Sequence, residues 1–354
     1  MSAETHPHGF RIVGPCSGDR RRVDAARAFA AYNACDARAG VEREAYLSAF
    51  QFGDDFAEHL ARSGSPAGFT GSTWSPFIWL DVDRDESAGG VGQALTDTRR
   101  LVDALDERHA VPRGVLMPFV SGGKGFHLGI PTALWCPPAS VDFHAVARQF
   151  AETIAAAAGV AVDASVFDRV RAFRAPNSRH PKTGLHKRFV PVEILDTVTV
   201  AGVLDMAREP APFDVPAVDG IESADMLVAV WDAAGRVVAD KAAAAEQRRL
   251  EVASGERSAR VNKLTRAFLA GEVVPGDRHR LCFSAAANLA ELGVPLSACQ
   301  ALLTEPALDT GLPPRDVARQ IACGHAAAHP LVTHAAEVFG GTVTKVVPGE
   351  AVPA

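Results

Sequence analysis

The chain has 354 residues, of which 47% are hydrophobic and 22% charged, and its formal net charge is −6. This composition is typical of a globular protein with two domains or one large core. No apolar run is long enough for a membrane span, the first residues lack a signal-peptide core, and the six scattered cysteines form no Cys-x-x-Cys pair. We therefore expect a cytoplasmic protein with reduced thiols, without a membrane segment, a zinc ribbon or a disulfide framework.

Apolar periodicity predicts an α+β catalytic region after a loose, Pro/Gly-punctuated lead-in at residues 1–22. Helices are expected at 23–38, 43–62, 91–109 and 141–158. Strands are expected from Phe77, on both sides of a glycine-rich turn near 122, and at 190–195. Strands and helices alternate irregularly with hairpins, which favours α+β over a doubly wound parallel sheet.

A segment with three prolines, residues 208–219, is predicted to be a linker that ends a catalytic domain at 23–207. Beyond it the chain is rich in alanine, and we expect a helical domain at 220–330. Its predicted helices lie at 224–250, 258–270, 278–292, 297–304 and 314–327. Residues 331–354 form a tail that we expect to be disordered from residue 340 onward.

Two carboxylates one residue apart follow the apolar run that starts at Phe77. In a strand, Asp81 and Asp83 project from the same face, while Val82 points to the other. Like charges held this close repel each other unless a cation lies between them, and hard divalent ions favour carboxylate oxygen. By itself the pair favours a strand that ends in a solvated acidic turn, because Arg84, Asp85 and Glu86 follow.

A glycine-rich turn, Ser121-Gly-Gly-Lys-Gly125, joins two apolar segments further along. Glycines bring backbone N–H groups close to an anion, and Ser121, Lys124 and His127 add donors that suit phosphate. A P-loop is excluded, because no Gly-Lys-Ser/Thr opens a helix here. The alternative is a glycine hairpin with a surface lysine.

A basic segment reverses the overall negative charge between residues 164 and 190. It contains seven cations and a single acid, Asp168; the cations are Arg169, Arg171, Arg174, Arg179, Lys182, Lys187 and Arg188. Such a segment suits a triphosphate or a nucleic-acid backbone, although several of these side chains fit an ordinary solvated loop. Asp163 follows the apolar residues Val160-Ala-Val and is placed to supply a third carboxylate.

Taken together, these segments resemble the archaeo-eukaryotic primase superfamily, specifically its primase-polymerase branch, over roughly residues 25 to 200. The similarity is carried by Leu80-Asp-Val-Asp83, by Gly125-Phe-His127 and by Val162-Asp163. The string Ser-Gly-Gly-Lys-Gly-Phe-His is also similar to a motif of the polymerase domains of bacterial end-joining ligases. One departure is Phe167, where the family often has tyrosine. The segment from Pro275 to Leu292 resembles the small helical domain that follows many bacterial and phage primases.

The resemblance implies an RRM-like antiparallel sheet packed with a second α/β unit, and two-metal nucleotidyl transfer with Mg²⁺ or Mn²⁺. It implies that Asp81, Asp83 and Asp163 hold the metals, with Asp85 and Asp168 as alternatives for the third ligand. Nucleotide-binding residues would be Ser121, Lys124, Gly125, His127, Arg171 and Arg174, and weaker phosphate ligands Lys182 and Lys187. No role is assigned to His180 or His186.

The activity so implied is a DNA-dependent primase-polymerase that acts on single-stranded DNA with dNTPs or NTPs, with a helicase or other replication proteins as potential partners. One alternative is a gap-filling or end-joining polymerase that never primes. Another is a non-catalytic replication-initiation protein that binds DNA through its helical region. Another phosphotransferase, such as a kinase, is a more distant alternative.

Overall fold

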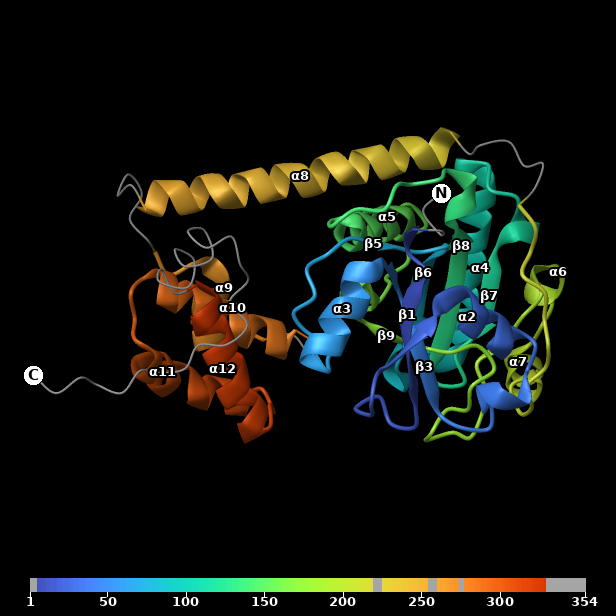
Figure 1. Cartoon of the computed structure of the whole chain (residues 1–354), viewed down its shortest axis with the longest axis horizontal. Coiled ribbons are helices and arrows are strands. Elements are labelled where there is room, and N and C mark those ends of the chain that lie inside the picture. The colour runs from blue at the N-terminus through green and yellow to red at the C-terminus, as the bar shows by residue number, and fades with distance from the viewer. Residues whose placement is uncertain (1–4, 219–224, 254–259, 274–276, 329–354) are drawn as a thin grey trace, which may run out of the picture. The chain divides into compact units, whose positions relative to one another are not determined.

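The computed structural model describes residues 5–218, 225–253, 260–273 and 277–328, and it divides the chain into two compact units, Met1–Ala243 and Ala244–Ala354. The first unit contains two antiparallel sheets with helices, and the second is helical (Figure 1). The predicted α+β class is therefore confirmed. None of the helices in the described ranges is long and apolar enough to cross a membrane.

The first sheet has the strand order β5-β4-β1-β3-β9. Strand β2 lies off this path and also pairs with β1. Its strands are β1 (His8–Val13), β2 (Arg21–Asp24), β3 (Ala45–Ser48), β4 (Gln51–Phe52), β5 (Thr73–Trp74) and β9 (Ala172–Arg174). The lead-in predicted at residues 1–22 is thus wrong for β1 and β2. Phe10 and Ile12 are fully buried, because β1 lies in the middle of the sheet.

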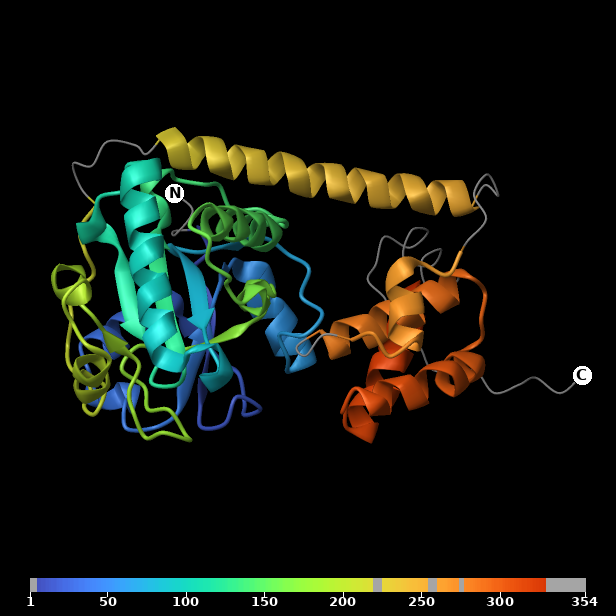
Figure 2. The same ribbon diagram turned by 180° about the vertical axis from the view of Figure 1, so that it is seen from behind.

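The second sheet has the order β10-β7-β8-β6 and carries the predicted glycine-rich turn between β7 and β8. Its strands are β6 (Phe77–Asp83), β7 (Met117–Val120), β8 (Gly125–Pro131) and β10 (Arg188–Phe189). Ile78, Leu80 and Val82 are buried on one face of β6. Helix α4 (Gly90–His109) packs on β6 and β8, and α5 (Phe143–Ala157) contacts α4 and β6 (Figure 2).

Three predicted elements differ from the structure. The helix expected at 23–38 is shorter, α2 (Ala25–Asn33). The helix expected at 43–62 is replaced by β3, β4 and α3 (Asp54–Ser63), because residues 45–48 pair with β1 and β9, and Gly53 and left-handed Gly64 delimit the helix. The strand expected at 190–195 is also wrong: β10 ends at Phe189, and α6 (Val192–Leu195) follows Pro191, which suits a position just before a helix.

The boundary predicted at 208–219 lies inside the first unit. After α7 (Val200–Met206), the Phe213 ring contacts Phe119 and Phe189 with centroids 5.3 and 5.0 Å apart. Helix α8 (Asp225–Ala253) spans the division between the units. Leu227 and Ala234 of its first half are buried, and its Trp231 packs against Phe143. The Pro-rich segment is thus attached to the first unit through Phe213, while Asp214 and Val215 are exposed.

The second unit is built on four helices among its described residues: α9 (Lys263–Leu269), α10 (Arg278–Glu291), α11 (Leu296–Asp309) and α12 (Pro314–Ala328). They share an apolar core that includes Phe268, Cys282, Leu303 and Ile321. The four short helices predicted beyond α8 are therefore present with shifted ends. The tail predicted at 331–354 lies outside the described residues.

Candidate functional site

Strand pairing brings the first and second sequence motifs together. β6 and β8 are antiparallel, with Asp81 opposite His127 and Asp83 opposite Gly125, and Phe119 of β7 lies on the other side of His127. Because facing residues share a side of the sheet, Asp81, Asp83 and His127 form one polar surface opposite the face that α4 covers. The His127 Nε2 atom lies 3.5 Å from Asp81 Oδ1.

Glycine is required at two positions of β8. A Cβ at Gly125 would lie 2.2 Å from the Val82 carbonyl oxygen and 2.5 Å from Asp83 Oδ1. A Cβ at Gly129 would lie 2.7 Å from the Trp79 ring, which occupies the space above it. Glycine at 125 and 129 therefore leaves room for the side chains of Asp83 and Trp79, which flank Asp81 on β6.

Asp81 is the most electrostatically perturbed carboxylate of this surface. Its side chain is only 16% exposed, and Oδ1 has no hydrogen-bond partner in the described structure. Burial, reinforced by the nearby charges of Asp83 and Asp163, raises its pKa from 3.8 to about 8. Burial also raises the pKa of Asp83, which Lys124 partly counteracts. Such mutual repulsion is what a bound cation would relieve.

The third predicted carboxylate, Asp163, lies near this pair but at the surface. Its N–H donates to the Asp81 carbonyl oxygen at 2.8 Å, so the chain before residue 163 runs beside β6. Its side chain caps the short helix Ala164–Phe167, accepting from the Ser165 N–H and hydroxyl. Of the two alternatives, Asp85 pairs with Lys124, and Asp168 accepts from the Val170 N–H.

These carboxylates are not assembled as a complete metal centre. Within the described ranges, no group of three or more His, Cys, Asp or Glu side chains is close enough to hold a metal. The free Oδ1 of Asp81 and the repulsion within the carboxylate set nevertheless fit a hard cation, which accepts oxygen ligands from other sources as well.

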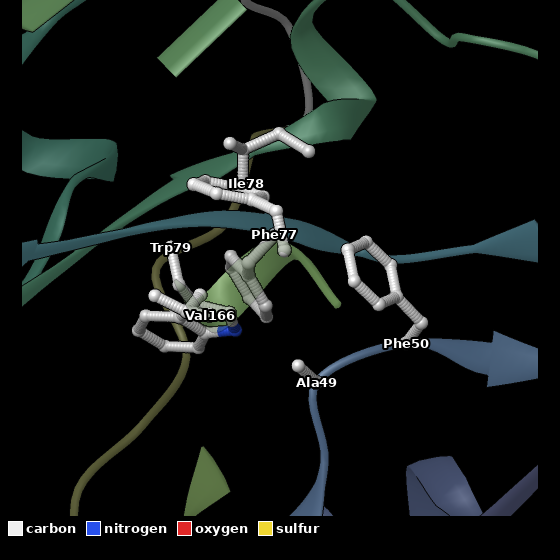
Figure 3. A pocket seen from close by; sticks show the side chains of 7 residues that line it. Ala49, Phe50, Phe77, Ile78, Trp79 and Val166 are labelled. Carbon is white, nitrogen blue, oxygen red and sulfur yellow. The ribbon is translucent and has the colours of Figure 1, made fainter. Parts of the chain in front are cut away.

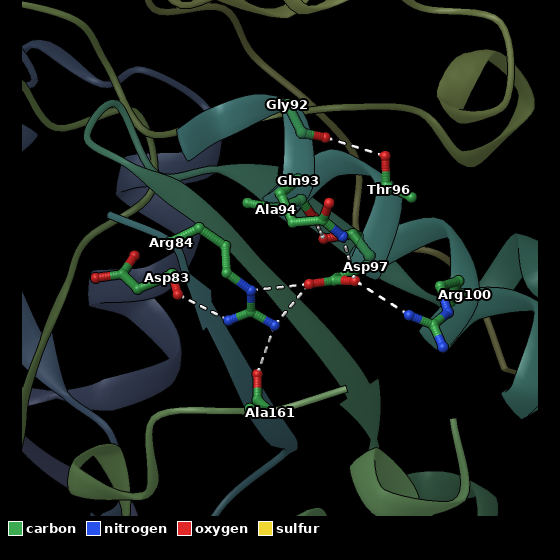
Figure 4. Close-up of polar contacts among 10 residues, drawn as sticks. Asp83, Arg84, Gly92, Gln93, Ala94, Thr96, Asp97, Arg100 and Ala161 are labelled. Carbon is green, nitrogen blue, oxygen red and sulfur yellow. Dashed lines mark hydrogen bonds and ion pairs between the residues drawn. The ribbon is translucent and has the colours of Figure 1, made fainter. Parts of the chain in front are cut away.

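Arg84, which was expected in a solvated turn, links three segments around the carboxylates. The Arg84 guanidinium pairs with buried Asp97 of α4 at 2.7 Å and donates to the carbonyl oxygens of Asp83 and Ala161 at 2.7 and 2.9 Å (Figure 4). One side chain therefore holds α4, the end of β6 and the segment that leads to Asp163. No local sequence signal distinguishes Arg84 from a surface arginine, because Asp97 lies thirteen residues away.

The glycine-rich turn is held by its own serine. The Ser121 side chain is buried, and its Oγ accepts from the N–H groups of Gly123 and Gly125 at 3.2 and 3.3 Å. Lys124 is paired with Asp85 at 2.7 Å and lies 3.8 Å from Asp83. The structure thus gives Ser121 a role in shaping the turn and places Lys124 beside the carboxylates.

Lys187 differs most from its prediction as a phosphate ligand. Its side chain is 1% exposed, and its Nζ donates to the Arg174 carbonyl oxygen at 3.0 Å. The Nζ atom lies 4.2 to 5.0 Å from the ring centroids of Phe173, Trp79 and Phe119. Burial lowers the Lys187 pKa well below 10.5, although the Asp81 charge opposes this. The Lys187 side chain therefore lies inside the protein, where its charge interacts with that of Asp81.

His127 is buried in the same surroundings. Its ring packs on Phe173, with centroids 4.4 Å apart, and its Nδ1 has no hydrogen-bond partner in the described structure. Burial and the charges of Lys187 and Arg174 lower its pKa well below 6.5, so the imidazole is neutral at neutral pH.

Three other predicted basic residues lie next to β9, on it and in the loop that follows: Arg171, Arg174 and Lys182. Arg171 and Lys182 are exposed, and the Arg171 charge acts on Asp81. Arg174 stacks on Tyr46 at 5.1 Å and donates to its hydroxyl. The loop is anchored by Asn177, which is fully buried with a left-handed φ of 58°. Its amide donates to the Tyr32 carbonyl oxygen and accepts from the Ala211 N–H, two contacts that the sequence does not suggest.

An apolar crevice lies beside Trp79. It is lined by Ala49, Phe50, Phe77, Ile78, Trp79, Val166 and Phe167 (Figure 3). Phe167 is 4% exposed and completes this apolar lining. A phenylalanine at this position therefore serves packing and supplies no hydroxyl to the site.

Comparison with known proteins adds little. No protein-family model matches the chain, and no curated protein matches it. Among solved structures, primase RepB′ is a weak neighbour that is 15% identical, with an alignment covering 96% of each chain and a TM-score of 0.34. A TM-score this low does not indicate a shared fold.

Proposed function

We propose that the protein is a nucleotidyltransferase that synthesises and extends primers on single-stranded DNA from nucleoside triphosphates. The observation that carries this proposal is the surface formed by Asp81, Asp83 and His127. Its Asp81 carboxyl is buried close to two other acids, the Oδ1 atom of Asp81 has no hydrogen-bond partner among the described residues, and the surface ends at a glycine-rich turn. Carboxylates beside a turn with free backbone donors suit the metal and phosphates of an incoming nucleotide.

Asp81 and Asp83, with Asp163 nearby, would hold Mg²⁺ or Mn²⁺. When bound, these ions lower the pKa of the attacking 3′-hydroxyl and neutralise charge on the leaving pyrophosphate. The chain's own residues position the reactants. Arg84 fixes the backbone of residues 83 and 161, so that the carboxylates on two segments keep their separation.

The basic and polar residues around the carboxylates receive the nucleotide and template in this proposal. Lys124 lies beside Asp83 and would exchange its Asp85 partner for a phosphate oxygen. His127, as a neutral imidazole, can donate one hydrogen bond to a phosphate. Exposed Arg171 and Lys182, together with Arg174, supply positive charge for the phosphates of the nucleotide or of single-stranded DNA.

The test is incubation with unprimed single-stranded DNA, Mn²⁺ and labelled dNTPs or NTPs. We expect labelled products that depend on the metal and are lost in Asp83→Asn. A parallel reaction with a primed template distinguishes the alternatives. Extension without unprimed synthesis would favour a gap-filling polymerase, and tight DNA binding without any synthesis would favour a non-catalytic replication protein.

A further inference from the structure

Strand β2 lies at an edge of the first sheet. Arg11 of β1 pairs with Arg21 of β2 on one side and with Leu47 of β3 on the other, so both sides of β1 are occupied. Strand β2 itself pairs with β1 and with no other strand in the part of the chain that the structure describes. Its Arg21, Arg22 and Asp24 side chains are exposed. The outer side of β2 is therefore an uncovered strand edge.

The backbone of Arg22 faces away from β1. In an antiparallel pair, successive residues turn their N–H and C=O groups alternately toward the partner strand and away from it. The Ala25 N–H donates to the Pro7 carbonyl oxygen at 2.9 Å, and this contact fixes the alternation so that Arg22 faces outward. The N–H of Phe10, opposite Arg22, accordingly lies on the far side of β1 and donates to Ser48 Oγ. Within the described ranges, no hydrogen bond joins the Arg22 backbone to another segment.

This edge also carries positive charge that the described residues do not neutralise. Three consecutive arginines form no ion pair with any described residue: Arg20, Arg21 and Arg22. The guanidinium of Arg20 lies 5.8 Å from the centroid of the buried Phe10 ring, and its Nε has no hydrogen-bond partner in the described structure. The nearby acid Asp24 is engaged by Arg27, since it accepts from the Arg27 N–H and lies 3.9 Å from Arg27 Nε.

The placement of these charges indicates which molecule fits the edge. Consecutive residues of a strand project from opposite faces, so Arg21 and Arg22 lie on the two faces of the sheet. A nucleic-acid backbone is bound by cations that are gathered on one face, and a second copy of β2 would bring arginines against arginines. The side chains of an added strand alternate in the same way, so two consecutive acidic residues of that strand reach Arg21 and Arg22 together.

We propose that the outer edge of β2 binds an extended, acidic segment of another protein, which joins the first sheet as an additional strand. The N–H and C=O groups of Arg22 supply main-chain hydrogen bonds, and the Arg21 and Arg22 guanidinium groups pair with acidic side chains on the two faces. The surface uses none of the residues that were assigned to metal or nucleotide. It is therefore a second, separate binding site on the same unit.

The probe is a fluorescein-labelled peptide, Thr-Val-Glu-Asp-Val-Thr, and its binding to the full chain is followed by fluorescence anisotropy. One control peptide has glutamine and asparagine in place of the two acids. Another keeps both acids but is N-methylated along its backbone, so that it lacks main-chain donors.

Two substitutions of Arg22 separate side-chain charge from main-chain pairing. Arg22→Gln removes the charge, whereas Arg22→Pro also removes the outward N–H. Proline is tolerated at an edge position whose N–H faces away from the sheet, so pairing with β1 is kept. Arg21→Gln removes the charge on the other face. The matched control is Arg62→Gln, an exposed arginine of α3, and the melting temperature of each variant checks the fold.

We expect the acidic peptide to bind the wild type and Arg62→Gln equally. Arg21→Gln and Arg22→Gln should each weaken binding roughly two- to fivefold, because each removes one cross-strand ion pair. Arg22→Pro should weaken it roughly tenfold, because a main-chain hydrogen bond is lost as well. The neutral and N-methylated peptides should bind the wild type roughly tenfold more weakly than the acidic peptide. Hydrogen exchange of the Arg22 amide should slow when the acidic peptide is added.

No binding of the acidic peptide to the wild type would overturn the proposal, as would equal binding of the N-methylated peptide, a comparison that needs no variant. Labelled single-stranded DNA and sedimentation of the unliganded chain test the other occupants. If the arginine variants lose DNA binding but keep peptide binding, the edge belongs to nucleic acid. If the wild type dimerises and Arg22→Pro does not, the edge belongs to a second copy. Either result would overturn the assignment to an acidic segment.

Discussion

The strand pair β6–β8 and the loop at residues 175–187 both contain charged residues that were predicted to form the site. The two regions orient these side chains in different ways. In the strand pair, alternation and register place Asp81, Asp83 and His127 on one surface. In the loop, Lys182 is exposed while Lys187, five residues later, is enclosed by three aromatic rings. Local geometry therefore fixes the side chains of the first region, and long-range packing fixes those of the second.

The largest expected effect comes from the strand pair. Asp81→Asn should reduce primer synthesis at least about a hundredfold, because it removes a carboxylate from the proposed metal site. Synthesis on unprimed single-stranded DNA checks this, with Asp85→Asn as the matched control, since Asp85 is an exposed acid that pairs with Lys124. Unchanged synthesis by Asp81→Asn would break the assignment of this surface.

The same substitution should alter how stability depends on pH when a chelator is present. Because the folded state raises the pKa of Asp81 from 3.8 to about 8, its contribution to stability is greatest below pH 4 and is lost as the pH rises toward 8. The free energy of unfolding of Asp81→Asn, relative to the wild type, should therefore increase over this range and level off above it. A difference in unfolding free energy between Asp81→Asn and the wild type that stays constant from pH 4 to 8 would contradict the raised pKa of Asp81.

At the end of β6, Arg84→Met should destabilise the protein by about 2–4 kcal/mol, because it leaves buried Asp97 with only the Gln93 amide and a longer contact to Arg100. Urea unfolding gives this value. The matched control is Arg38→Met, whose partner Asp36 belongs to an exposed ion pair and whose loss should change stability little. Equal effects of the two substitutions would show that Arg84 does not fasten the two segments.

In the loop, Asn177→Gly should cost about 1–3 kcal/mol, because it removes one buried and one partly buried hydrogen bond but tolerates the left-handed backbone. Asn177→Ala should cost about 1 kcal/mol more, since alanine is strained at φ 58°. Chemical denaturation of both variants tests the order. If alanine is the milder substitution, the backbone at residue 177 is not constrained as described.

The smallest effect is expected for Lys187→Met, which keeps the ring contacts and removes a desolvated amine. Stability at neutral pH should stay the same or increase, because replacing a buried ionisable group by a well-packed apolar one is often neutral or favourable. Thermal melting measures this, with exposed Lys182→Met as the control. A clear loss of stability would mean that the ammonium contributes to the fold.

These contrasts explain which parts of the fold could be predicted. The strand from Phe77 and the helix near 91–109 follow from local periodicity, and the pairing of Asp81 with His127 places the first two motifs side by side. β1 was missed because its burial depends on pairing with β2 and β3. The roles of Arg84, Asn177 and Lys187 were missed because each depends on partners distant in the sequence.

In the proposed function, the surface of Asp81, Asp83 and His127 binds a divalent metal together with a nucleotide. Mn²⁺ binding, followed by electron paramagnetic resonance with and without a non-hydrolysable triphosphate, tests it most directly. We expect bound Mn²⁺ in the wild type and in Asp85→Asn, with tighter binding when nucleotide is present, and loss of binding in Asp81→Asn and Asp83→Asn. Undiminished Mn²⁺ binding by both of the last two variants would contradict it.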